Sequence, residues 1–367
     1  MKSIKLIMYS ATVYVKVYSC ILIMCVFISC SENKLNYLSK IKKIDEFEYT
    51  VLNEWKEVYK DSLKVQSWYS SGNDSTYFIS RLSNIEEINE QKFWVYDYIQ
   101  GKVFEFNEEG LITNEILETG KGPQEVLKPF SIDRYIEKED TLVYVFDGGN
   151  KSIIKLNTNG NELGRVYSES ITERMMDAQV EILNVNSFIY PNYSTEKYSL
   201  IEFDSAGNFK KGWVNRLVPL GKQPVTYNDV AFLVNQDQEL FIYSYQGLPL
   251  VFVTHGNRKF VLNLEPKVEI SSINTPLEFK EENEGLAVKK LIRTISTIDD
   301  YILVNYLSEL ILIPFDKNNR IIRYKLIDEN GNLLKFHFME VTQNYIFLIN
   351  GFKGKMYRLK KNNLTPS

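Results

Sequence analysis

The chain has 367 residues, of which 44% are hydrophobic, and a formal net charge of −4 at pH 7. This length and apolar content are enough for one large domain or two ordinary ones with a buried core. The near-neutral charge argues against a nucleic-acid partner, because nucleic-acid-binding surfaces are normally strongly basic. Aromatic residues make up 13% of the chain, which favours β structure.

Residues 1–29 are predicted to form a lipoprotein signal peptide. Lysines precede an apolar run from Val17 to Ile28, which has the length of a signal-peptide core and is too short to span a bilayer. The run ends in Phe27-Ile28-Ser29-Cys30, followed by polar residues, and this pattern resembles the bacterial lipobox. The resemblance implies cleavage before Cys30 and acylation of its sulfur, which would anchor the protein in a membrane. The alternative is a hydrophobic leader with a chance cysteine, and translation starts at either Met1 or Met8.

All three cysteines, Cys20, Cys25 and Cys30, lie in this N-terminal segment. A mature domain without other thiols excludes disulfides, cysteine-zinc sites and cysteine nucleophiles. Residues 30–45 are expected to be the lipidated cysteine and a polar tether, and residues 46–367 a single domain.

From about residue 63 onward the sequence repeats one unit, in which an aromatic-rich strand is followed by a polar turn and a second strand. The strand pairs start near Phe93, Leu142, Phe188, Leu240, Tyr301 and Tyr345. Periods of roughly 40–50 residues with several strands per unit are typical of β-propeller blades. We therefore predict an all-β fold, a six-bladed β-propeller of four-stranded antiparallel blades. A β-sandwich is the main alternative.

The repeats share an Asn/Asp-x-x-Gly turn. It occurs at Asn107–Gly110, Asn157–Gly160, Asp204–Gly207 and Asp328–Gly331, and His255-Gly256-Asn257 is a shorter version. The Asn or Asp side chain is expected to accept hydrogen bonds from the following N–H groups, and the Gly to adopt a left-handed conformation. A strand from residues 64–69 or 47–52 is expected to complete the last blade and close the ring. Residues 265–290 are expected to be an inserted loop.

One loop carries a family resemblance. The segment Gly120-Lys121-Gly122-Pro123-Gln124-Glu125, between two strand pairs, resembles the motif of six-bladed β-propeller lipoproteins of Bacteroidetes, which are related to NHL-repeat and TolB-like propellers. That family usually has Gly where Gln124 stands and an aromatic residue where Val126 stands. The resemblance implies an envelope lipoprotein on the outer membrane and brings no catalytic residues with it.

The same loop, with Gly120, Gly122, Pro123 and Glu125, could bind an anion through its backbone N–H groups. Pro123 removes one donor and no helix N-terminus follows, so a structural turn between blades is expected instead. Asp97 and Asp147 occupy equivalent positions after their aromatic strands. This equivalence favours a repeated turn cap over a unique metal ligand.

Flat aromatic side chains are candidates for a ligand platform. The candidates are Trp213, Trp94, Trp68 and Tyr245, with Trp213 the best of them. Stacking on a sugar would suit such residues, while the competing interpretation is packing within and between blades.

Two functions remain open, and no catalytic residue, cofactor or metal is predicted. The first is a non-catalytic envelope lipoprotein that presents the propeller to a glycan, a peptide or an envelope protein. The second is a propeller hydrolase or lyase with a site in the central funnel. Acidic and amide side chains from four or more blades around the axis would favour the second, and aromatic, hydroxyl and backbone groups the first. A sensor partner in an envelope signalling complex is a third option.

Overall fold

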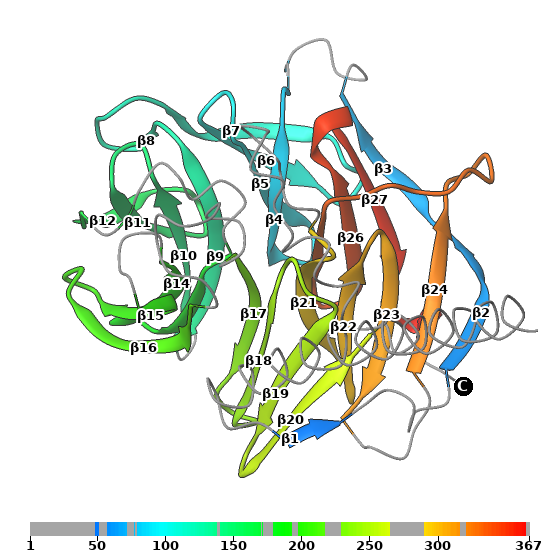
Figure 1. Cartoon of the computed structure of the whole chain (residues 1–367). Helices are drawn as coiled ribbons and strands as arrows, with labels where there is room; N and C mark the ends of the chain where they lie inside the picture. The colour runs from blue at the N-terminus through cyan, green and yellow to red at the C-terminus, as the bar shows by residue number, and fades with distance from the viewer. Residues whose placement is uncertain are drawn as a thin grey trace, which may run out of the picture.

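The computed structural model describes residues 48–50, 57–71, 77, 79–137, 140–169, 171, 179–192, 197–216, 229–264, 290–315 and 321–364. Within them the chain forms six antiparallel four-stranded sheets, arranged as the blades of a six-bladed β-propeller (Figure 1). The predicted fold is therefore confirmed, and the β-sandwich is excluded. The predicted signal peptide, Cys30 and the tether to residue 45 lie outside the described residues. In the described part, no helix has the length and apolar character needed to cross a membrane.

Each blade runs from an axial strand to an outer strand. Blade 1 is β4 (Leu82–Asn89), β5 (Lys92–Asp97), β6 (Lys102–Asn107) and β7 (Ile112–Thr119). Blade 2 is β9 (Pro129–Glu137), β10 (Asp140–Asp147), β11 (Ser152–Asn157) and β12 (Glu162–Tyr167). Blade 3 is β13 (Glu181–Asn184), β14 (Ser187–Pro191), β15 (Tyr198–Asp204) and β16 (Phe209–Asn215).

The second half of the ring repeats this order. Blade 4 is β17 (Val230–Asn235), β18 (Leu240–Tyr245), β19 (Leu250–His255) and β20 (Arg258–Asn263). Blade 5 is β21 (Ile292–Ile298), β22 (Tyr301–Tyr306), β23 (Glu309–Pro314) and β24 (Ile321–Ile327). Blade 6 is β25 (Phe338–Val341), β26 (Tyr345–Asn350), β27 (Lys355–Lys360) and β3 (Gln66–Ser70). The second strand of every blade begins within two residues of a predicted start.

An N-terminal strand closes the ring. β3 pairs antiparallel with β27, and Figure 1 shows it beside that C-terminal strand. This confirms the first of the two predicted closing segments. The other segment forms β1 (Glu48–Thr50), which pairs parallel with β20 in blade 4 instead. Two further parallel strands extend blades, namely β2 (Glu57–Lys64) beside β24 and β8 (Glu125–Val126) beside β7.

The hydrophobic core lies between neighbouring blades, because the middle strands are covered on both faces. In β5, for example, every residue from Phe93 to Asp97 is buried. Blade 6 and blade 1 join through Trp68 of β3, whose ring centroid lies 5.4 Å from that of Phe93 and 4.8 Å from that of Phe347. Aromatic pairs at such distances add to the free energy of burial. The closing strand is therefore anchored by packing as well as by its backbone hydrogen bonds.

The repeated turns have the predicted conformation. Asp204 Oδ1 accepts from the N–H groups of Ala206 (2.9 Å) and Asn208 (2.8 Å), and Asp328 makes the same two contacts in blade 5. The four turn glycines have φ between 81° and 84°, the left-handed region that glycine tolerates best. Only residue 290 of the predicted insertion at 265–290 lies within the described residues.

Candidate functional site

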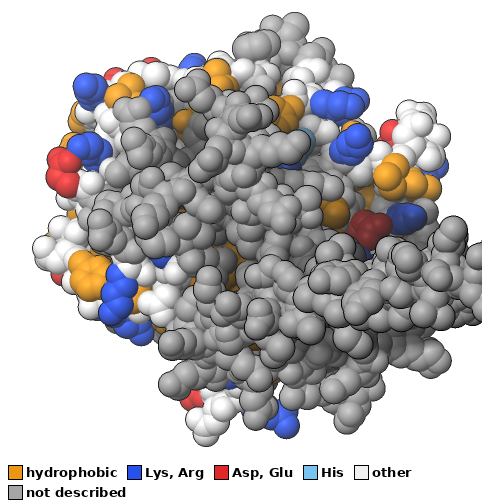
Figure 2. Space-filling model, viewed as in Figure 1, with side chains coloured by type: hydrophobic (Ala, Val, Ile, Leu, Met, Phe, Trp, Pro, Cys, Tyr) orange, Lys and Arg blue, Asp and Glu red, His pale blue; other side chains and the backbone are white. Residues whose placement is uncertain are grey.

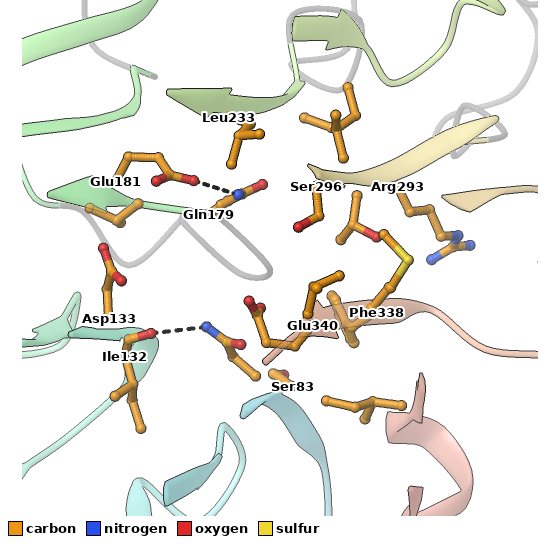
Figure 3. Close-up of a pocket in the computed structure, with 18 of the residues that line it drawn as sticks. Ser83, Ile132, Asp133, Gln179, Glu181, Leu233, Arg293, Ser296, Phe338 and Glu340 are labelled. Atoms are coloured by element: carbon orange, nitrogen blue, oxygen red, sulfur yellow. Dashed lines mark hydrogen bonds between the residues drawn. The ribbon is translucent and has the colours of Figure 1, made fainter. Parts of the chain in front are cut away.

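A cavity of about 220 Å³ lies at the propeller axis (Figure 3). It is lined by the first strand of every blade, and these six strands also contact one another around the axis. Side-chain alternation along a strand explains how polar groups reach it. In β4, for instance, Asn84 and Glu86 line the cavity, whereas Ile85 between them packs in the hydrophobic core. We call this space the axial cavity.

Four carboxyl groups from four blades face the axial cavity. They are Glu86 on β4, Asp133 on β9, Glu181 on β13 and Glu340 on β25. Blades 6, 1, 2 and 3 follow one another around the ring, so these groups form one continuous acidic arc. Amide side chains accompany them, from Asn84, Gln179 and Gln246. This is the arrangement expected of the second function considered above.

Burial raises the pKa of every member of the acidic arc, and repulsion from neighbouring carboxylates adds to the shift at Glu86, Glu181 and Glu340. Burial raises the pKa of Asp133 to about 7, although the N–H of Ile182 donates to Asp133 Oδ2 at 3.1 Å and opposes this shift. Burial and then the Asp133 carboxylate raise the pKa of Glu340 to about 8. The same causes hold the pKa of Glu86 and that of Glu181 well above the ordinary value. Near neutral pH the arc therefore keeps protons that exposed carboxyl groups would have lost.

Few partners compensate these charges. Arg134 Nε lies 3.2 Å from Glu86 Oε1, and Gln179 Nε2 donates to Glu181 Oε1 at 2.8 Å. Opposite the arc, blades 4 and 5 contribute neutral groups such as Leu233, Thr294 and Ser296, together with Arg293. The cavity is thus acidic on one side and mostly neutral on the other.

Three buried polar atoms around the cavity have no hydrogen-bond partner within the described residues. They are Ser83 Oγ, Thr294 Oγ1 and Gln246 Oε1. Ser83 is 1% exposed and Gln246 is 7% exposed. Buried polar groups in folded proteins are nearly always satisfied, so a polar molecule in the cavity is expected to bind them.

The acidic arc is not arranged as a metal centre. Across the described ranges, no three His, Cys, Asp or Glu side chains converge in a way that could hold a metal ion. Asp97 and Asp147 are turn caps, as predicted. Asp147 accepts from the N–H groups of Leu127 (3.0 Å), Lys128 (2.8 Å) and Gly149 (3.0 Å). Asp97 accepts from the N–H groups of Ile99 and Gln100 at 2.9 and 3.1 Å.

Three of the four aromatic candidates cannot form a ligand platform. Trp94 is 0%, Tyr245 1% and Trp68 7% exposed, so all three pack in the core and cannot stack on a ligand. Trp213 is half-buried, its Nε1 donates to Glu202 Oε2 at 3.0 Å, and Lys211 Nζ lies 3.9 Å from its ring centroid. The platform prediction is therefore wrong for Trp94, Tyr245 and Trp68, and for Trp213 it stays a prediction. In aromatic-rich strands of a propeller, packing between blades takes up these side chains.

The Gly-Pro loop is a structural turn between blades 1 and 2. Gln124 has φ +58°, the left-handed conformation for which the family motif has glycine. The N–H groups of Gly122 and Gln124 donate to the carboxylates of Glu125 (2.6 Å) and Glu162 (2.8 Å), so protein groups already occupy these donors. Arg165 Nη2 donates to the carbonyl oxygens of Gly122 (3.2 Å) and Glu125 (3.1 Å). The arrangement has the turn geometry that we predict for Gly120, Gly122, Pro123 and Glu125.

On the face seen in Figure 2, the visible described residues place basic, acidic and apolar side chains among one another around the rim. The axial cavity is the candidate functional site, and the sequence analysis did not identify its acidic residues. A pattern in the sequence could have identified these acidic residues. The strand before the aromatic strand of blades 1, 2, 3 and 6 carries an acid among apolar residues, as in Ile132-Asp133 and Met339-Glu340-Val341.

Comparisons with known proteins add little beyond the fold. No model of a known protein family matches the chain, and none of the curated proteins matches it either. Among solved structures, a protein of Bacteroides fragilis described as exported has 10% identity and a TM-score of 0.48, covering 84% of this chain and 98% of its own. A catalytically inactive virginiamycin B lyase from Staphylococcus aureus with quinupristin has 11% identity and a TM-score of 0.47, covering 81% and 98%.

A member of the DUF4221 family from Bacteroides vulgatus is similar to the same extent, with 9% identity and a TM-score of 0.45 over 82% of this chain and 96% of its own. Similarity at this level assigns neither a family nor an activity to the chain. The function has to be argued from its own residues.

Proposed function

We propose that this protein is an envelope lipoprotein that binds a small polar ligand in the axial cavity. The observation that carries the proposal is the set of buried polar atoms without partners, namely Ser83 Oγ, Thr294 Oγ1 and Gln246 Oε1. Leaving such an atom unsatisfied costs about 1–3 kcal/mol, so a ligand that bonds them gains this energy on binding. A catalytic function would include the same binding step, so binding is the more general of the two functions.

The size of the cavity limits the ligand. At about 220 Å³ it has the volume of roughly seven water molecules at about 30 Å³ each. This suits a group the size of a monosaccharide or an amino acid, either free or at the end of a glycan or peptide. The lipobox-like pattern ending in Cys30 supports attachment to the outer membrane, on either its periplasmic or its surface face.

Filling the cavity tests the binding proposal. The full chain, purified in detergent, is screened by thermal shift against monosaccharides and dipeptides. Ser296 lines the cavity, so Ser296→Phe is expected to abolish the shift of any cavity ligand, whereas Leu111→Phe on an exposed turn is expected to keep it. A ligand at 100 times its Kd stabilises the folded state by about 2.7 kcal/mol, which is readily detected. Equal shifts in the two variants would contradict the proposal.

A second candidate function, an acid–base hydrolase or lyase, is favoured by the acidic arc itself. At neutral pH a Glu340 carboxyl with a pKa of about 8 is mostly protonated and can donate a proton, while Asp133, with a pKa of about 7, is partly ionised and can accept one. Paired groups poised in this way are typical of general acid–base sites. Mass spectrometry of a bound ligand after incubation separates the two functions. If the ligand is converted to a product and Asp133→Asn abolishes this conversion, the protein is an enzyme. If the ligand is recovered unchanged, the protein is a binding protein.

A further inference from the structure

We infer that the ligand of the axial cavity carries a protonated amine, which the acidic arc of Glu86, Asp133, Glu181 and Glu340 holds by charge and hydrogen bonds. The inference rests on the proposed function and names the class of its ligand. Its starting point is a charge imbalance. Four carboxyl groups from four blades share one cavity, and Arg134 is the cation that pairs with one of them.

The cation that belongs to the lining itself, Arg293, is directed elsewhere. Figure 3 shows the carboxyl groups of Asp133, Glu181 and Glu340 on one side and in the middle of the cavity, with the guanidinium group of Arg293 at the opposite side and pointing away from them. Each proton that the acidic arc loses therefore leaves a negative charge that the lining itself does not fully compensate. A cationic group entering from solvent would be attracted to it.

The hydrogen-bonding groups point to the same class of ligand. Gln246 is 7% exposed and belongs to the lining of the cavity, and its Oε1 has no donor within the described residues. An amide oxygen and an ionised carboxylate only accept hydrogen bonds, and a protonated amine has three donors and no acceptor. Ser83 also belongs to the lining, and its Oγ can accept as well. A neutral hydroxyl could satisfy some of these acceptors, but it would not compensate the charge.

Titration of the arc supports this geometry. Burial raises the pKa of all four groups, and the Asp133 carboxylate raises it further for the three glutamates. Arg134 acts against the shift for Glu86, Asp133 and Glu340, and Glu87 adds to it for Glu86. A bound cation reverses the sign of the local field, lowers these pKa values and releases protons. Binding of an amine is therefore expected to release protons to the buffer, whereas binding of a neutral ligand is not.

A metal ion is the competing cation, and the geometry disfavours it. The part of the chain that the structure describes offers no group of three ligands that could coordinate one ion. The carboxyl groups instead line a space large enough for a small organic cation. The chemistry of the cavity is thus that of an amine site with polar walls.

Isothermal titration calorimetry on the full chain in detergent tests this inference with matched pairs. Glucosamine is compared with glucose, and ethanolamine with ethylene glycol, because each pair differs only by an amine in place of a hydroxyl group. At least one amine is expected to bind about tenfold or more tightly than its partner, a difference of about 1.4 kcal/mol. Titration in two buffers of different ionisation enthalpy is expected to show proton release. If no amine binds better than its hydroxyl counterpart, the inference is overturned.

Charge-removing variants locate the site. Glu340→Gln and Glu181→Gln are each expected to weaken amine binding about tenfold, while Glu109→Gln, in an exposed turn, leaves it unchanged. Glutamine keeps the size of the side chain, and the loss of one repelling charge does not threaten folding, so both variants are expected to remain folded. Amine binding that survives both changes, or a thermal shift with calcium that a chelator reverses, would contradict the amine site.

Failure of this inference is distinguishable from failure of the proposed function. If a neutral ligand binds and Ser296→Phe blocks it, the cavity is the binding site but its ligand is not an amine. If amines bind equally well to the Ser296→Phe variant, they bind elsewhere and the inference fails. If no compound of either screen binds in a manner that Ser296→Phe alters, both proposals fall.

Discussion

The Asp133 carboxylate raises the pKa of Glu340 from across the axial cavity, although the two residues lie in blades that do not pair. Asp133 belongs to β9 of blade 2 and Glu340 to β25 of blade 6, with blade 1 between them. Burial and the Asp133 carboxylate together raise the pKa of Glu340 to about 8. The axial cavity is therefore one electrostatic unit, and its charge can be tested through stability.

The first prediction concerns pH. Glu340 has a usual pKa of 4.5 and a folded-state pKa of about 8. Below the lower value both states are protonated and the group has no effect. As the pH rises towards the higher value, the unfolded chain loses the proton first, so the free energy of unfolding falls by up to about 1.4 kcal/mol per pH unit. Glu340→Gln is expected to flatten this decline in urea unfolding between about pH 5 and pH 8. A decline identical to that of Glu109→Gln would disprove it.

The second prediction concerns ring closure at Trp68. This side chain is 7% exposed, packs against three phenylalanines and donates from Nε1 to the carbonyl oxygen of Glu108 at 2.7 Å. Trp68→Ala is expected to lower the free energy of unfolding by about 3–5 kcal/mol, measured by urea denaturation. Leu163→Ala, at a side chain that is 54% exposed, is the control and should change it by less than about 0.5 kcal/mol. Similar losses in both variants would show that Trp68 does not anchor the closing strand.

The third prediction separates backbone strain from packing in two equivalent turns. Gly110 and Gly331 have φ of +83° and +82°. A Cβ at Gly110 would lie 2.2 Å from the carbonyl oxygen of Trp68, whereas one at Gly331 would meet nothing within 4 Å. Gly331→Ala is expected to cost about 1–2 kcal/mol for the left-handed conformation alone. Gly110→Ala should cost clearly more in the same thermal or urea melts, because β3 must shift. Equal costs would rule out the contact as a constraint.

The fourth prediction concerns Arg165 at the Gly-Pro loop. Its guanidinium group binds two loop carbonyl oxygens and also Glu162, with Arg165 Nε lying 3.1 Å from Glu162 Oε1. Lysine cannot make these divergent contacts from one group. Arg165→Lys is therefore expected to destabilise the fold by about 1–3 kcal/mol. Arg258→Lys, at the exposed first residue of β20, is the control: it makes the same substitution, also keeps the positive charge, and should be neutral. A neutral Arg165→Lys would mean that the loop holds its shape without this residue.

The fifth prediction tests the proposed anchor. Cys30→Ser removes the sulfur that acylation requires, so the protein is expected to leave the membrane fraction and to lose incorporation of labelled palmitate. Cys25→Ser, within the same apolar run, is the matched control and should retain both. Membrane attachment that persists in Cys30→Ser would refute lipidation at this position.

The blades could be predicted from sequence because they repeat. Six aromatic strands and four Asn/Asp-x-x-Gly turns recur at similar spacing, and a local rule fixes each turn, as Asp204 and Gly207 show. For the closing strand, the sequence predicts two possible segments, because either could supply an edge strand. Pairing with β27 chose one of them, and only the folded ring reveals that choice.

The axial cavity could not be predicted in the same way. Glu86 and Glu340 lie far apart in the sequence, and their approach depends on closure of the whole ring. Three of the aromatic candidates failed for a related reason. Whether a ring such as Trp94 faces solvent or the next blade is decided by the neighbouring sheet, which the local sequence does not specify.

Pairing of Ser70 with Lys355 means that the ring can close only late in synthesis, because these residues lie near opposite ends of the chain. During synthesis from the N-terminus, β3 emerges early but has no partner until β27 has been made. Until that moment the last blade keeps an unpaired strand edge, which is the kind of surface on which chains aggregate. Folding that depends on such distant pairings is also slow. The nascent protein is therefore expected to depend on a chaperone until β27 has been made. A chain shortened at its N-terminus beyond residue 70 would keep the unpaired edge of β27 permanently.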